Sequence, residues 1–188
     1  MLVVGPYRAM PSGSTTRLQA GKGRTSCRSR CPAGRFQRGI QIQRTRSAID
    51  GADRALRFYR DVFGARIADS VEIEGAVVHA ELDFGHGRLQ IGEPSALSGL
   101  VATPSDEPVC YSIGLYCPNV DAVTERATAA GATLLEPPTT FVSGDRLASI
   151  RDPFGVRWAV MTRVEDLSEE ESAARVAAWA KEQAGGEK

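Results

Sequence analysis

The sequence predicts an α+β protein in which two tandem βαβββ modules form a cupped mixed sheet. Three observations support this prediction. The order of strand, helix and three strands occurs twice, with an offset of about 67 positions. A polar stretch that contains Ser, Pro and Gly, at residues 95–107, separates the two copies. The helix of each copy is followed by a glycine, Gly64 or Gly131, as is typical of a helix end.

The first module contains an amphipathic helix with a start signal and a stop signal. Asp50 stands where a side-chain oxygen can cap the first N–H groups of the helix, and Gly64 ends it. Leu56, Tyr59 and Phe63 recur at three- and four-residue spacing, which gives the helix one apolar face. The expected elements are a helix at 52–63 and strands at 66–73, 77–84 and 88–91.

The second module repeats this order. Asn119 is the expected N-cap of its helix, and Gly131 is the expected stop. Asp152, Pro153 and Gly155 are interpreted as residues of the turn that joins the last two strands, because proline presets φ and glycine tolerates positive φ. The expected elements are a helix at 120–130 and strands at 109–116, 132–137, 146–151 and 157–161.

A third helix is predicted near the C-terminus. Ser168 and Glu171 have the spacing of a capping box, and the helix is expected to run to about residue 183. Trp179 is interpreted as a packing anchor on this helix. The predicted organisation is a leader at 1–39, a domain at 40–164 with modules at 40–94 and 109–162, and a C-terminal helix and tail at 165–188.

The leader differs from the rest of the chain in composition. Ten of the 23 basic residues lie within residues 1–46, which contain no acidic residue. Residues 1–39 show neither helical nor strand periodicity, so this segment is predicted to be disordered. It fits an organelle transit peptide, an upstream start in an arginine-rich reading frame, or a basic arm for an anionic surface.

Composition excludes several classes of function. The chain beyond the leader carries more acidic than basic residues, which argues against nucleic acid as a partner. No apolar run approaches the roughly 18 to 20 residues that span a bilayer, so no membrane role is expected. Cys110 and Cys117 are too far apart along one strand to bond to each other, and reduced thiols in a cytoplasmic protein are expected. The other two cysteines, Cys27 and Cys31, lie in the leader.

Two sets of motifs resemble those of a known family. The first module carries the segment FYRDVFGA at residues 58–65, and the second carries GDR at 144–146 and DPFG at 152–155, followed by Trp158. These motifs resemble the vicinal oxygen chelate superfamily of glyoxalases, bleomycin and fosfomycin resistance proteins and extradiol dioxygenases, and above all its PhnB-like glyoxalase-related branch. The resemblance covers roughly residues 48–171 and implies a homodimer.

The resemblance also implies four positions for a divalent metal inside the cup, one on each of four strands. Metal-binding members of the family place His, Glu or sometimes Gln there. Counted from the motifs, the positions in this sequence are Gln43, Gln90, Ser112 and Ala159. Amide and hydroxyl oxygens are weak ligands for such a metal, and alanine offers no donor atom. We therefore expect no metal and no other cofactor.

The two histidines lie close together in the sequence. A period of two places His79, Glu81 and Asp83 on one face of a strand, where they form either an acid and base set or a solvated face. In the first case the chain is an enzyme, a lyase, isomerase or dioxygenase type that uses a relocated metal or metal-independent chemistry, with His79 and Glu81 as catalytic residues. His86 is interpreted as an exposed turn residue.

The favoured hypothesis is a protein that binds a small organic molecule in the cup with a degenerate metal site. Tyr116 and Arg157 are expected to face the cavity and to contact an aromatic or anionic group. Arg146, at the rim, either pairs with an anionic ligand or fixes the loop with Asp145. The expected ligand-binding set is Gln43, Gln90, Ser112, Tyr116, Arg146, Arg157 and Ala159.

Overall fold

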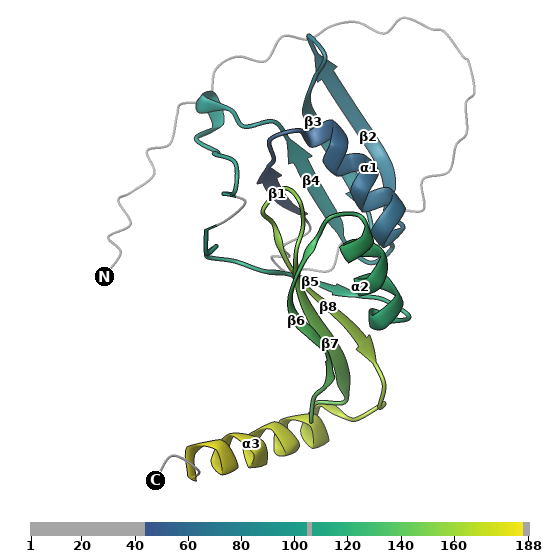
Figure 1. The fold of residues 1–188 in the computed structure, drawn as a ribbon, viewed down its shortest axis with the longest axis vertical. Coiled ribbons are helices and arrows are strands. Elements are labelled where there is room, and N and C mark those ends of the chain that lie inside the picture. Colours follow the sequence, from purple (N-terminus) through teal and green to yellow (C-terminus); the bar gives the residue numbers. More distant parts are fainter. Residues whose placement is uncertain (1–43, 105–106, 186–188) are drawn as a thin grey trace, which may run out of the picture. The chain divides into compact units, whose positions relative to one another are not determined.

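The structure is a computed structural model that describes residues 44–104 and 107–185. Residues 40–188 form a unit separate from residues 1–39. The predicted leader and Gln43 therefore lie outside the described residues. The elements of the first module are β1 (Arg44–Ala48), α1 (Ala52–Phe63), β2 (Arg66–Ile73), β3 (Ala76–Asp83) and β4 (Arg88–Gly92). Those that follow are a 3-10 turn (Ala96–Ser98), β5 (Ile113–Tyr116), α2 (Val120–Ala129), β6 (Thr133–Thr140), β7 (Asp145–Arg151), β8 (Arg157–Arg163) and α3 (Glu169–Gly185) (Figure 1).

The two modules have the same topology, as the repeat predicted. The first sheet has the strand order β1-β4-β3-β2, and the second has β5-β8-β7-β6. In each sheet the first strand pairs in parallel with the last, and the other neighbours are antiparallel, so both sheets are mixed. Helix α1 packs on β2 and β3, α2 packs on β6, β7 and β8, and the two helices contact each other. The α+β prediction with two βαβββ modules is confirmed.

The two ends of α1 are capped in different ways. Gly64 adopts φ of 72° and donates to the carbonyls of Tyr59 and Arg60, as predicted for a helix stop. The start is capped by Glu93 rather than by Asp50: the Glu93 carboxylate accepts from the amide of Ala52 at 2.8 Å and from that of Gly51 at 3.3 Å. Glu93 follows β4, and the parallel pairing of β4 with β1 brings it to the helix start.

Several element boundaries differ from the predicted ones. Strand β5 contains only Ile113–Tyr116, so Val109 to Ser112 lie outside the sheet. Strand β6 continues through Pro137 and Pro138 to Thr140, because β6 is the outer strand of its sheet and proline needs no partner on the solvent side. Helix α2 starts as predicted, with Asn119 accepting from the amide of Ala122 at 3.0 Å.

A buried carboxylate joins the two modules. Asp152 accepts hydrogen bonds from the hydroxyl of Tyr59 at 2.7 Å and from the indole N–H of Trp158 at 2.9 Å. It also accepts from the amides of Phe154 and Val156, each at 2.9 Å. Burial raises the pKa of the Asp152 carboxyl above its ordinary value, and these four hydrogen bonds oppose that rise. Asp152 was interpreted as a turn residue only; it also links α1 to β8.

Aromatic rings surround this carboxylate. Tyr59 and Phe63 on α1 meet Trp158 at centroid distances of 5.3 and 4.7 Å, and Phe84 meets it at 6.1 Å. Trp158 is 1% exposed. The core of the first module is thus continuous with that of the second, because Trp158 contacts side chains from both.

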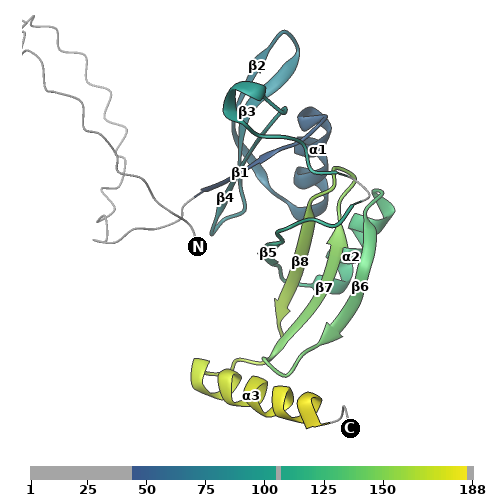
Figure 2. The ribbon, with the colours of Figure 1, turned by 90° about the vertical axis from the view of Figure 1, so that its left-hand side faces the viewer.

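Helix α3 lies beside the β6–β7 hairpin (Figure 2). Its capping box is confirmed by the amide of Glu171, which donates to the Ser168 hydroxyl at 3.2 Å, and by the Ser168 amide, which donates to the Glu171 carboxylate at 3.0 Å. Trp179 packs edge-on against Phe141 at 5.0 Å, as expected of an anchor. Within the described residues, no helix is both long enough and apolar enough to cross a membrane.

Candidate functional site

The face of the second sheet that points away from α2 holds four of the predicted ligand-binding residues. Ala159 on β8 lies opposite Gly114 on β5 and Ser149 on β7. Ser112 precedes β5 and its hydroxyl donates to the carbonyl of Arg157 at 3.5 Å. We call this surface, which also includes Tyr116 and Arg157, the open face of the second sheet.

The polar side chains of this open face are already paired. Arg157 donates to the Ser149 hydroxyl and to the Glu136 carboxylate, both at 3.0 Å. The Tyr116 hydroxyl donates to Asp145 at 3.3 Å. A ligand that binds here must therefore compete with existing hydrogen bonds and ion pairs, which lowers the net gain from each new contact.

Arg146 lies on the other side of the same sheet. It is opposite Thr162, and its guanidinium binds Asp121 of α2 through two hydrogen bonds of 2.8 and 2.7 Å. This bidentate pair raises the pKa of Arg146 and lowers that of Asp121. Arg146 therefore fixes α2 to the sheet, a contact that neither interpretation of this residue included, and its role toward a ligand stays a prediction.

The first sheet carries the His79, Glu81 and Asp83 stripe on one face, as the period of two indicated. Glu81 lies opposite Gln90, and Asp83 lies opposite Arg88. Glu81 is 7% exposed and accepts hydrogen bonds from Arg88 and, at 3.5 Å, from the Gln90 amide. Arg88 thus occupies the Glu81 carboxylate, and this ion pair would have to open before Glu81 could accept a proton from a ligand.

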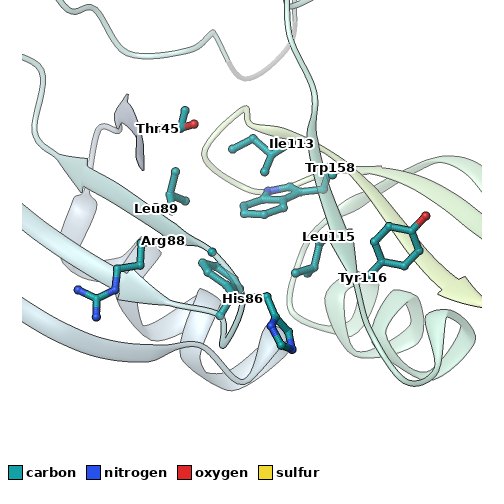
Figure 3. A pocket seen from close by; sticks show the side chains of 11 residues that line it. Thr45, His86, Arg88, Leu89, Ile113, Leu115, Tyr116 and Trp158 are labelled. Carbon is teal, nitrogen blue, oxygen red and sulfur yellow. The ribbon is translucent and has the colours of Figure 1, made fainter. Parts of the chain in front are cut away.

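A cavity opens between the edge strands β1 and β5, which belong to different modules (Figure 3). Its volume is about 320 Å³, within the range of small-molecule sites. Trp158 lies in its wall, although this residue is only 1% exposed to solvent. We call it the seam pocket; it is lined by Thr45, Phe84, His86, Gly87, Arg88, Leu89, Ile113, Gly114, Leu115, Tyr116 and Trp158.

Of the members of the predicted ligand-binding set that the structure describes, which exclude Gln43, only Tyr116 lines the seam pocket. His86 is an exposed residue of the turn between β3 and β4, as interpreted, and it also lines this pocket (Figure 3). Leu89 and Trp158 were not predicted as site residues, because their sequence patterns indicate core positions. The pocket forms where the cores of the two modules meet. No pattern within a short stretch of the sequence predicts this contact.

Comparison with known proteins places the chain in a family. Residues 41–160 match the model of the Glyoxalase/Bleomycin resistance protein/Dioxygenase superfamily. The chain belongs to this superfamily. The match spans both modules and ends within β8, so it excludes α3. The resemblance that the FYRDVFGA and DPFG segments indicated is thereby confirmed.

The chain is also similar to individual proteins of known sequence or structure. The uncharacterized protein Rv0887c of Mycobacterium tuberculosis is 30% identical over 134 residues, which is 65% of this chain and 75% of that protein. The crystal structure of TioX from Micromonospora sp. ML1 is 27% identical, with a TM-score of 0.51 over 66% of this chain and 99% of that chain. A PhnB protein from Bacillus cereus shares the fold, with 17% identity and a TM-score of 0.50 over 66% and 99% of the two chains.

The described residues of this glyoxalase-superfamily chain do not fit the divalent metal that the family implies. Ala159 has no donor atom, the Ser112 hydroxyl is bonded to a backbone carbonyl, and the Gln90 amide faces Glu81. Within residues 44–104 and 107–185, no three or more His, Cys, Asp and Glu side chains are grouped as a metal site requires. Neutral oxygen donors without a carboxylate or imidazole bind first-row divalent metals weakly.

Proposed function

We propose that this member of the glyoxalase superfamily binds a small organic molecule in the seam pocket and does not use the metal chemistry of the family. The observation that carries the proposal is the pocket itself, an apolar cavity of about 320 Å³ to which both modules contribute. Cavities of this size with mostly apolar walls and few polar groups are typical ligand sites.

The lining indicates a flat ligand. Phe84 and Trp158 present aromatic rings, and Leu89, Ile113 and Leu115 supply aliphatic walls. Aromatic rings in such a wall gain both buried apolar area and edge or stacking contacts with a ligand ring. A bicyclic aromatic compound therefore suits the pocket better than a sugar or a flexible polar chain.

The contacts and positions of the predicted acid and base residues favour a binding role over an enzymatic one. Glu81 is held by Arg88, and the His79 stripe lies on the face of the first sheet that carries Gln90, whereas the pocket wall includes Leu89 of the opposite face. Neither catalytic candidate lines the pocket. A ligand in the seam pocket would thus meet mostly hydrophobic walls and neither of the two predicted catalytic residues.

The test uses Trp158 as a reporter. In a Trp179→Phe background, Trp158 is the remaining tryptophan. Titration with the uncharged probe 2-naphthamide is expected to quench its fluorescence in a saturable manner with one site per chain. Thr45→Phe, which places a ring in the mouth of the pocket, is expected to weaken binding at least about tenfold, since a filled cavity excludes the probe.

The matched control is Thr133→Phe, which introduces the same ring on the exposed surface of β6. It should leave the affinity for 2-naphthamide unchanged. Saturable binding that survives Thr45→Phe, or its absence from the parent protein, contradicts the proposal. Thr45 is exposed, so its replacement should change the free energy of unfolding by no more than about 0.5 kcal/mol.

A further inference from the structure

The lining of the seam pocket differs from the rest of the domain in the sign of its charged side chains. Among the residues that the structure describes, its lining contains two basic side chains, His86 and Arg88, and no acidic one. Arg88 is turned toward Glu81 and Asp83, and both of these acids lie outside the lining. The chain beyond the leader has an excess of acidic residues, so a pocket with only basic groups departs from the average surface.

Some hydrogen-bonding groups of the described lining already have partners, and others do not. The Tyr116 hydroxyl donates to Asp145, and the Arg88 guanidinium binds Glu81. Within the described part of the chain, the Thr45 hydroxyl and the His86 imidazole have no hydrogen-bond partner. These two groups can bond to a ligand without breaking an existing contact.

His86 is placed to act at the mouth of the pocket. It lies in the turn between β3 and β4, with Gly85 and Gly87 on either side, and its side chain is exposed. Figure 3 shows the His86 ring at the edge of the lining, beyond Leu115 and directed away from Trp158, whereas Arg88 points away from the β5 side. An apolar ligand body against Trp158 would leave its polar end near this imidazole.

We propose that the seam pocket selects aromatic carboxylates, with the ring in the apolar interior and the carboxylate bound by His86 at the mouth. This inference rests on the proposed function of the same pocket and adds the charge of the ligand to it. A histidine N–H donates to a carboxylate in either charge state, and the imidazolium form adds an attraction between opposite charges.

The experiment compares two probes of the same shape, 2-naphthoate and 2-naphthamide, in the Trp179→Phe background. The carboxylate is expected to bind about fivefold more tightly at low ionic strength, the size of effect typical of an exposed charged contact. His86→Ala should abolish this preference and leave the affinity for 2-naphthamide unchanged. Lys181→Ala removes a positive charge from α3 and should leave the preference intact.

The outcomes separate the two proposals. If both probes bind equally and His86→Ala changes neither affinity, the charge selection is overturned while the pocket remains a ligand site. If Lys181→Ala reduces the preference as much as His86→Ala, the selection comes from net charge and not from His86, which also overturns the inference. If neither probe binds, the proposed function fails together with the inference drawn from it.

Discussion

We expect Asp152→Ala to lower the free energy of unfolding by about 4 kcal/mol. The replacement removes the acceptor of four hydrogen bonds, from Tyr59, Trp158, Phe154 and Val156. A buried donor left without a partner costs roughly 1 to 3 kcal/mol, and the backbone amides can recover part of this loss by meeting water. Unfolding by urea, followed by circular dichroism, measures the change.

Asp152→Asn is the matched control for this variant. Asparagine keeps the volume of the side chain and one acceptor oxygen, so about half of the loss should return. A loss below about 1 kcal/mol for Asp152→Ala would contradict the role of this carboxylate as the link between α1 and β8, because a surface turn residue typically contributes about 0.5 kcal/mol or less.

We expect Trp158→Ala to have an effect of similar size, about 3 to 5 kcal/mol. Trp158 is 1% exposed and contacts Tyr59, Phe63 and Phe84. Truncation removes this contact area, deletes one donor to Asp152 and enlarges the seam pocket from within. Urea unfolding measures the loss of stability. Because this variant lacks the Trp158 reporter, binding is measured with tritiated or intrinsically fluorescent naphthalene probes.

The control compares the two tryptophans of the chain. Trp179 is 39% exposed and packs on Phe141 alone among the described rings, so Trp179→Ala should cost much less than Trp158→Ala. The double variant Asp152→Ala with Trp158→Ala should lose less than the sum of the two single losses, because the single variants break a shared hydrogen bond. Equal losses for the two tryptophans, or full additivity with Asp152, would contradict the described core.

The elements that the sequence predicted correctly are those with local signals. Gly64 and Asn119 act on backbone groups within a few residues of themselves, so their roles are readable from the chain. Glu93 caps a helix that begins 41 residues earlier in the sequence. No pattern near Glu93 indicates that contact, because it depends on the pairing of β1 with β4.

The site residues were harder to predict, because the site also depends on contacts between segments that are distant in the sequence. Alternation placed Arg157 and Ala159 on one sheet face correctly, and the register confirms this. Arg146 was placed near the rim, with a ligand contact and a loop-fixing role left open, and the alternation of β7 puts it with Ala148 on the α2 side. The seam pocket was missed because it forms where two separately patterned cores approach each other, and His86 was set aside as an ordinary turn residue.

The central claim is that this glyoxalase-superfamily protein binds an organic ligand without a metal. The most direct measurement is the titration of chelator-stripped Trp179→Phe protein with 2-naphthamide, repeated after the addition of Zn²⁺, Ni²⁺ or Mn²⁺. We expect saturable binding to one site per chain with the same affinity in every condition. Binding that appears only after a divalent metal is added would contradict it.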